Sequence, residues 1–185
     1  MVKLKRIERA VQRVRMSDPA VRLKAAGTML LIGALLLQLV WCPAPRLVWN
    51  VSNSAPKGLY FVRPGASHSV GDMVVAKLPD PWRGLAAHRH YLPRNVPLVK
   101  RVAAIEGDEV CARGRRVLIN DVPTVLRFAR DGAGRALPWW RGCRVLHRGE
   151  VFLLMSAPAS SFDGRYFGVM KGGAVVGRAT LIWPA

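Results

Sequence analysis

The hydrophobic residues of this chain follow two different patterns, one on each side of residue 46. From Ala25 to Trp41, seventeen consecutive residues carry no charge, and a helix extended back to Pro19 has 23 residues. Such a helix is about 34 Å long at 1.5 Å per residue, enough to cross the ~30 Å hydrocarbon core of a bilayer. After residue 46 the apolar residues come in short runs. The pattern predicts one membrane-spanning helix followed by a domain of strands.

Signals at both ends of the helix support these limits. Asp18 is suited to cap the first turn, and Pro19 is tolerated at the first helical position. Pro43 ends the helix, and the eight basic residues before the apolar run favour retention of the amino terminus in the cytoplasm. We therefore expect a basic cytoplasmic tail, a transmembrane helix and an exported domain, over residues 1–18, 19–42 and 43–185 in turn.

Two features of the amino-terminal region allow alternatives. Hydrophobic residues at 4, 7, 11 and 14 recur at helical spacing among basic ones, which fits either a helix on the cytoplasmic leaflet or a solvated basic tail. A cleaved signal peptide is the rival to a permanent anchor. Cleavage needs small residues after the apolar run, but Trp41, Pro43 and Pro45 are bulky or rigid. We expect an uncleaved anchor.

The chain after residue 46 has the pattern of strands separated by Gly, Pro, Asn and Asp. Asn120-Asp121 predicts a hairpin, and Pro123 just after it suits an edge strand. Only Trp82 to His90 indicates a short helix, and Ala129 to Arg141 reads as a loop insertion. The predicted fold class is mainly β, a folded sheet or partial barrel. Its strands are Leu47 to Val51, Leu59 to Val62, Asp72 to Leu78, Leu98 to Ile105, Glu109 to Ala112, Val117 to Ile119, Val122 to Phe128, Glu150 to Met155 and Val175 to Trp183.

The charge is strongly basic, with 29 Lys and Arg against 11 Asp and Glu. A net charge of +18 favours an anionic partner, either nucleic acid or a membrane with anionic lipids. The basic tail lies directly before the apolar run, so we expect inner-membrane lipids as the partner and no direct contact with nucleic acid. Since 22 of the 29 basic residues are Arg, part of the excess of positive charge is also explained by a source genome whose base composition favours Arg codons, with no role in binding.

One turn carries candidate chemistry. Ser52 and Ser54 precede Pro56 and Gly58, a rigid arrangement that can present two hydroxyls just before a strand. A serine needs a base to attack a carbonyl, and a lysine can serve if burial removes its charge. Among the lysines after residue 46, Lys100 has the most apolar sequence neighbours. Ser, Pro and Gly are also common in surface turns, and a lysine on an edge strand can prevent aggregation. An ordinary turn and an ordinary edge lysine therefore remain alternative explanations.

Three sequence blocks in this order resemble the S26 signal peptidase family, over about residues 19 to 183. They are Ser52-Asn53-Ser54-Ala55-Pro56-Lys57-Gly58-Leu59-Tyr60, the run around Lys100, and Ser161-Phe162-Asp163-Gly164-Arg165-Tyr166-Phe167-Gly168. Their form is similar to the conjugative-transfer branch, the TraF-type peptidases that mature pilins. Housekeeping leader peptidases usually carry a Gly-Asp-Asn-Arg box, and here Met155-Ser156-Ala157-Pro158 stands in its place. The resemblance implies a serine endopeptidase that acts through a Ser-Lys dyad.

The resemblance also implies a role for each site residue. Ser54 matches the nucleophile and Lys100 the general base, while the Ser52 hydroxyl and the Ser54 backbone N–H match the oxyanion hole. Ser161 matches a serine that orients the lysine.

Three further residues match supporting positions. Asp163 and Arg165 match a pair that braces the site, which a structural ion pair would also explain. Ser156, inside the altered box, is a further supporting residue.

The implied substrate is an exported pilin-like precursor, bound by strand addition and cleaved at the outer face of the bacterial inner membrane. Conjugation or type IV secretion machinery is a further expected partner. A general leader peptidase and a non-catalytic bitopic scaffold are the alternatives. A self-cleaving repressor of related fold is disfavoured by the anchor and by the absence of a DNA-binding segment. Whether water or an amine of the substrate resolves the acyl-enzyme stays open.

Cysteines and histidines add little further chemistry. Cys111 and Cys143 lie in the expected exported domain, where a disulfide could persist, and two buried free thiols are the alternative. Cys42 is expected at the outer interface. The four histidines show no triad pattern, and there is no Cys-x-x-Cys spacing, so we expect no cofactor and no metal.

Overall fold

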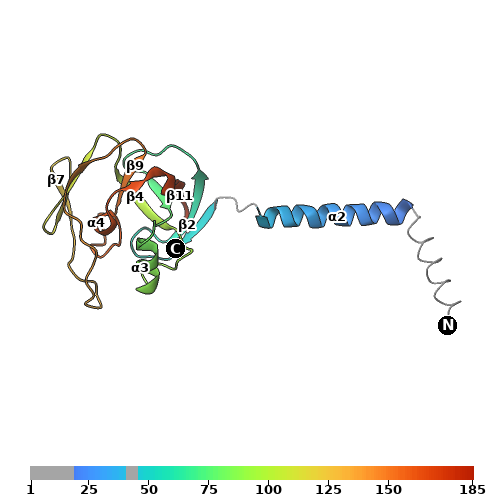
Figure 1. Ribbon diagram of the computed structural model, residues 1–185, viewed down its shortest axis with the longest axis horizontal. Helices are drawn as coiled ribbons and strands as arrows, with labels where there is room; N and C mark the ends of the chain where they lie inside the picture. The colour runs from blue at the N-terminus through green and yellow to red at the C-terminus, as the bar shows by residue number, and fades with distance from the viewer. Residues whose placement is uncertain (1–18, 41–45) are drawn as a thin grey trace. The chain divides into compact units, whose positions relative to one another are not determined.

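A computed structural model describes residues 19–40 and 46–185 of the chain (Figure 1). It divides into two compact units, Met1–Pro43 and Ala44–Ala185, and each is described by itself. The first contains helix α2 (Pro19–Val40), so the predicted helix is present. The basic tail, the Asp18 cap, Trp41 and Cys42 lie outside the described residues. None of the helices in residues 19–40 and 46–185 is long and apolar enough to cross a membrane, so the transmembrane role predicted for 19–42 is unsupported.

The second unit is built on an open antiparallel sheet of seven strands. β-Branched and aromatic residues dominate these strands, as the sequence predicts. Bulges in the pairing of β11 with β2 and β3, and of β4 with β9, add the local bend and twist that curl a sheet. In spatial order the strands are β1 (Leu47–Asn50), β2 (Gly58–Pro64), β11 (Val175–Pro184), β3 (Met73–Ala76), β4 (Leu98–Ala104), β9 (Glu150–Leu154) and β10 (Met170–Lys171).

A second antiparallel sheet has the order β7 (Val122–Leu126), β6 (Arg116–Ile119), β5 (Glu109–Arg113) and β8 (Gly142–Val145). Asn120 and Asp121 join β6 to β7 with φ of 51° and 61°, the left-handed values of a two-residue hairpin turn. Pro123 lies on β7, an edge strand, where a missing N–H costs no ladder bond. The predicted hairpin, edge strand and mainly β class are confirmed. β7 lies at the opposite end of this unit from β2 (Figure 1).

The helices of the second unit are short. α3 (Trp82–His88) confirms the predicted helix, whereas α4 (Gly164–Phe167) and the 3-10 turn η1 (Gly172–Ala174) were not predicted. α4 begins where the Asp163 carboxylate accepts the backbone N–H of Arg165. Four residues are too few for helical periodicity, which is why the pattern did not reveal it. The strand β8, which is exposed throughout, shows no alternation of buried apolar and exposed polar residues, and the two-residue β10 is too short for one, so both were also missed.

Three apolar clusters form the core of this unit, and β4 contributes to all of them. Leu98 and Val102 pack with α3 and α4, Val99 packs with β2 and β3, and Ala104 packs with the small sheet. β4 is therefore buried on both faces, apart from its exposed Arg101. A polar residue on this strand is held inside the protein.

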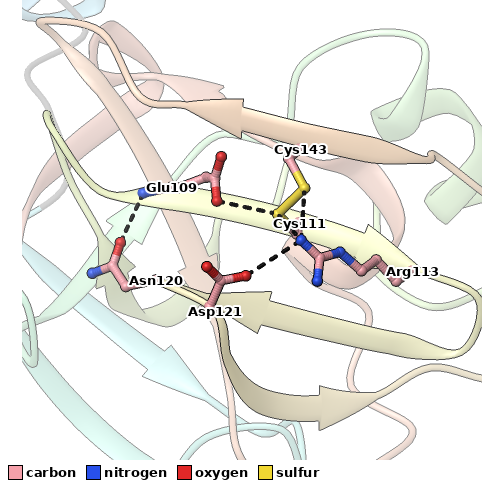
Figure 2. Close-up of a disulfide and its surroundings, with 6 residues drawn as sticks. All are labelled: Glu109, Cys111, Arg113, Asn120, Asp121 and Cys143. Atoms are coloured by element: carbon pink, nitrogen blue, oxygen red, sulfur yellow. Dashed lines mark hydrogen bonds and ion pairs between the residues drawn. A yellow bond between two sulfur atoms is a disulfide. The ribbon is translucent and has the colours of Figure 1, made fainter.

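A disulfide joins Cys111 on β5 to Cys143 on β8, residues that are directly opposite in the register (Figure 2). Of the two alternatives left open by the sequence, the bond is therefore present and the free thiols are not. It joins two neighbouring strands of the small sheet, one before and one after the loop insertion of residues 129–141 in the sequence.

Candidate active site

The turn between β1 and β2 is organised by Asn50, the last residue of β1. Its side-chain amide donates to the carbonyls of Ser52, Ala55 and Pro56 at 3.2, 3.1 and 3.0 Å. Its side-chain carbonyl accepts the backbone N–H of Ser52 at 3.1 Å. Only 8% of Asn50 is exposed, so these are bonds that water cannot readily replace. One buried amide thus fixes the backbone that carries both serines.

Ser54 and Lys100 come together at this turn although 46 residues separate them. Lys100 Nζ donates to Ser54 Oγ at 2.7 Å and to Ser161 Oγ at 2.9 Å. The hydroxyl oxygens of Ser52 and Ser54 are 2.9 Å apart. Within residues 46–185 no acceptor is described for the Ser54 backbone N–H, which leaves this donor available to a ligand. The structure therefore gathers both serines of the turn, the lysine and Ser161 into one cluster.

The Lys100 side chain is only 3% exposed, because β4 places it among apolar neighbours. Burial lowers the pKa of Lys100 from its usual 10.5 to about 8, since the ammonium loses its hydration. The Asp163 carboxylate acts in the opposite direction, and the Arg165 guanidinium lowers the pKa further. Near pH 8 a substantial fraction of Lys100 is a neutral amine that can accept a proton.

Asp163 and Arg165 form a fully buried pair beside the lysine. Arg165 Nε donates to Asp163 Oδ1 at 2.8 Å, and the Met155 backbone N–H donates to Asp163 Oδ2 at 3.1 Å. Arg165 also donates to the carbonyls of Leu126, Ala159 and Met155, the first two at 3.3 and 2.7 Å. These bonds tie the segment after β9 to the small sheet and hold Ser161 in place. Asp163 and Arg165 therefore form an ion pair, and the same two residues also connect the segments around Ser161.

A cleft of about 830 Å³ opens beside Ser54 and Lys100. Its walls come from the turn after β1, from the start of β4, from the segment around Ser161 and from the loop insertion. The first two walls were expected from the sequence, and the other two were not. The lining is mostly apolar and includes Trp49, Val96, Leu98, Tyr91, Phe128, Leu137, Phe162 and Tyr166. An extended peptide with apolar side chains fits such a surface.

Other predicted residues do not join this cluster. Ser156 is exposed, and no side-chain hydrogen bond is described for it within residues 46–185. All four histidines are in the described part of the chain, and none lines the cleft. Among the described residues, Glu109, Cys111 and Cys143 could in principle offer metal ligands, but the two sulfurs are bonded to each other. Trp140 packs in the core and donates to the Gly164 carbonyl at 3.0 Å.

Asn50 and the loop insertion are the main site elements that the sequence reasoning missed. Asn50 carried a recognisable signal, because an Asn whose side chain accepts the N–H two residues on forms an Asx-turn. The loop insertion carried none. Asp131 in that loop accepts a hydrogen bond from Tyr91, and both residues line the cleft together with neighbours of Asp131. This contact joins segments 40 residues apart, which no local pattern encodes.

The Lys100 amine is buried and its pKa is lowered, the Ser54 hydroxyl is within hydrogen-bond reach of it, and the Ser52 hydroxyl lies beside Ser54. Chemically, such an arrangement allows proton transfer from a hydroxyl to an amine. A family model described as "Signal peptidase, peptidase S26" matches residues 21–184. The chain belongs to this family of serine peptidases, and the resemblance indicated by the sequence is confirmed.

Two proteins from Escherichia coli, each called "Plasmid transfer protein TraF", are similar to this chain. One is 34% identical over 91 residues, which are 46% of this chain and 51% of that protein. The chain therefore spans about half the length of this relative. The other is 31% identical over 131 residues, which are 64% of this chain and 72% of that protein. The resemblance to the TraF-type branch is thus confirmed as well.

A crystal structure of a signal peptidase I from Enterococcus faecalis V583 is 20% identical to this chain. The matched region covers 62% of this chain and 98% of the chain in that structure, and the TM-score is 0.36. The fold assignment here depends on the strand order and the family match.

Replacing Asn50 tests its hold on the serine turn. Asn50→Ala leaves one N–H and three carbonyls of the turn without their partner, and we expect a loss of about 2–3 kcal/mol in the free energy of unfolding. Asn53→Ala, in the same turn but exposed, is the matched control and should change stability by less than about 0.5 kcal/mol. Urea unfolding of both variants measures this. Equal stabilities would show that Asn50 does not organise the turn.

The depressed pKa of Lys100 makes stability depend on pH. Between about pH 8 and 10.5 the unfolded chain binds more protons than the folded one, so the free energy of unfolding contributed by Lys100 rises with pH. Wild type should gain up to roughly 3 kcal/mol relative to Lys100→Met across this window. Lys77→Met, at an exposed lysine, should show no such trend. Urea unfolding at several pH values measures the difference, and a flat Lys100 profile contradicts the assignment.

Proposed function

We propose that this chain is a serine endopeptidase in which Ser54 is the nucleophile and Lys100 the general base. The observation that carries this proposal is the 2.7 Å contact between Ser54 Oγ and the buried Nζ of Lys100. Ser161 supports it, because its hydroxyl accepts a second hydrogen bond from Nζ and so fixes the direction of the amine. A lysine that served only to guard a sheet edge would be exposed to solvent.

The proposed reaction follows from these positions. Neutral Lys100 accepts the Ser54 proton as Oγ attacks a peptide carbonyl, and the resulting ammonium gives a proton to the leaving amine. The Ser54 backbone N–H and the Ser52 hydroxyl stabilise the oxyanion, each by about 3 kcal/mol if well placed. A water molecule, or an amine of the substrate, then resolves the acyl-enzyme and regenerates the serine.

The substrate we propose is an exported pilin-like precursor, bound as an extended strand in the cleft. The mostly apolar walls support an extended peptide with apolar side chains. The similarity to two plasmid transfer proteins supports a place in conjugative transfer, and conjugation or type IV secretion components are then partners. A general leader peptidase and a non-catalytic scaffold are the alternatives. The experiment below distinguishes the scaffold from a peptidase.

We place residues 46–185 on the periplasmic side of the bacterial inner membrane. The Cys111–Cys143 disulfide supports this, because such bonds persist in oxidising compartments and are rare in the cytosol. Membership of a signal peptidase family supports an association with the cell envelope.

Processing of a co-expressed pilin precursor, measured by mass spectrometry, tests the dyad. Ser54→Ala and Lys100→Met should each abolish shortening of the precursor, because each removes one half of the proton transfer. Ser67→Ala and Lys77→Met are matched controls at exposed positions and should process like wild type. All four must retain the wild-type thermal unfolding midpoint to within a few degrees.

The result separates the classes. Processing by Ser54→Ala or Lys100→Met at the wild-type rate would overturn the dyad and favour the scaffold. The mass of the product shows whether water or an internal amine resolved the acyl-enzyme. A leader peptidase would also process unrelated exported precursors.

Cleavage of the precursor by the purified protein, measured across pH, tests the role of Lys100. Only the neutral amine can accept the serine proton, so kcat/KM should rise about tenfold per pH unit below about pH 8 and level off above it. The expected midpoint is that of Lys100 in the free enzyme. A histidine base would place the midpoint near 6.5. A profile that is flat between pH 6 and 9 would contradict lysine as the base.

A further inference from the structure

The small sheet has an outer face that the proposed peptidase function does not use. Its inner face packs in the core through Val110 and Val117. Because side chains alternate along a strand and register partners share a face, the opposite face carries Cys111, Arg113 and Arg116. Figure 2 shows Arg113 on this face, between the disulfide and the Asp121 carboxylate.

Three arginines gather at one hairpin on this face. Arg113 and Arg116 are direct cross-strand partners at the β5–β6 hairpin, and Arg115 lies in the turn between them. Like charges directly opposite each other are destabilising in a sheet. Asp121 offsets only part of this, because its 3.3 Å contact to Arg113 is an exposed pair that salt screens. The hairpin therefore carries excess positive charge that a bound anion would relieve.

These three arginines, together with three apolar residues, line a cleft of about 510 Å³. The cleft is lined by Arg113, Arg115, Arg116, Leu118, Pro123 and Leu126, and it shares no residue with the cleft beside Ser54. On β7, Leu126 is 52% exposed and Pro123 is also exposed. Their register partners Arg116 and Leu118 place both on this outer face. The cleft therefore offers guanidinium groups to a charged group and aliphatic side chains to hydrocarbon.

Charge and backbone chemistry decide which anion fits. A guanidinium group binds phosphate oxygens in a bidentate manner. A peptide added to the sheet at β7 would need main-chain bonds to this edge strand, but Pro123, the second residue of β7, lacks an N–H. Residues 46–185 carry 21 Lys and Arg against nine Asp and Glu, so a surface of high negative charge density attracts the whole domain.

We propose that this arginine cleft binds the headgroup phosphate of an anionic phospholipid, with Pro123 and Leu126 against the acyl region of the membrane surface. This site goes beyond the proposed peptidase function, since it involves none of the residues of the Ser-Lys cluster. It gives the domain its own contact with an anionic membrane surface, independent of the amino-terminal residues.

Vesicle sedimentation with the full-length chain tests the proposal. The probes are vesicles of phosphatidylcholine alone and vesicles with about one-third phosphatidylglycerol. The triple variant Arg113→Gln, Arg115→Gln and Arg116→Gln should bind the anionic vesicles at least about tenfold more weakly than wild type, since each arginine near an anionic surface contributes about fivefold. Phosphatidylcholine vesicles should not distinguish the two proteins.

A charge-matched control separates a site from general attraction. Arg63→Gln, Arg94→Gln and Lys171→Gln remove the same charge from exposed positions outside the cleft and should weaken binding by less than about threefold. If the arginine triple does not fold, judged by its thermal unfolding, the pair Arg115→Gln and Arg116→Gln is compared with Arg63→Gln and Arg94→Gln.

Three outcomes would overturn the proposal. Equal losses in the two variant sets would show that only net charge acts. If the arginine triple binds the vesicles as tightly as wild type does, the cleft takes no lipid. This conclusion holds even if inorganic phosphate alone raises the unfolding temperature of wild type. Displacement of wild type from the vesicles by a soluble acidic peptide, with no difference between variant sets, would assign the cleft to a protein partner.

Discussion

The desolvation of a single ammonium group, that of Lys100, is the constraint on which the site depends. A charged amine buried to 3% exposure is unstable unless it loses its proton or gains partners. Here both happen: burial lowers the pKa to about 8, and two serine hydroxyls accept its hydrogen bonds. The same burial that disfavours the charge creates a base. Stability and reactivity are therefore opposed at this residue, and the surrounding fold has to hold it there.

Two rigid supports hold that geometry from opposite sides. Asn50 fixes the turn that presents Ser54, and the buried pair of Asp163 and Arg165 fixes the segment that presents Ser161. Each support satisfies backbone groups and leaves the Ser54 and Ser161 hydroxyls in contact with Lys100, which suits a site that must be preorganised. Asp163 also acts electrostatically, since its carboxylate limits how far the pKa of Lys100 falls.

The two sheets divide the chemistry of the domain between them. The larger sheet builds a mostly apolar cleft beside the reactive groups, where an extended peptide can lie. The smaller sheet carries a second cleft lined by arginines. The disulfide joins two of its own strands, β5 and β8, and Arg165 ties β7 to the segment after β9. The proposed lipid contact and the proposed peptidase chemistry therefore depend on different residues.

The sequence by itself determined the strand pattern, the hairpin at Asn120-Asp121 and the serine turn, because turn and strand preferences are local. It also pointed to Lys100, since alternation along one strand places that side chain among apolar neighbours. The Asn50 contacts span only two to six residues, so that Asx-turn was open to sequence reasoning. Only the tertiary structure decided which hydroxyls the amine meets, and that the loop insertion contacts Tyr91 at the cleft. Those contacts join segments 40 to 61 residues apart, and local sequence preferences do not encode them. Folding alone brings such groups within hydrogen-bond distance.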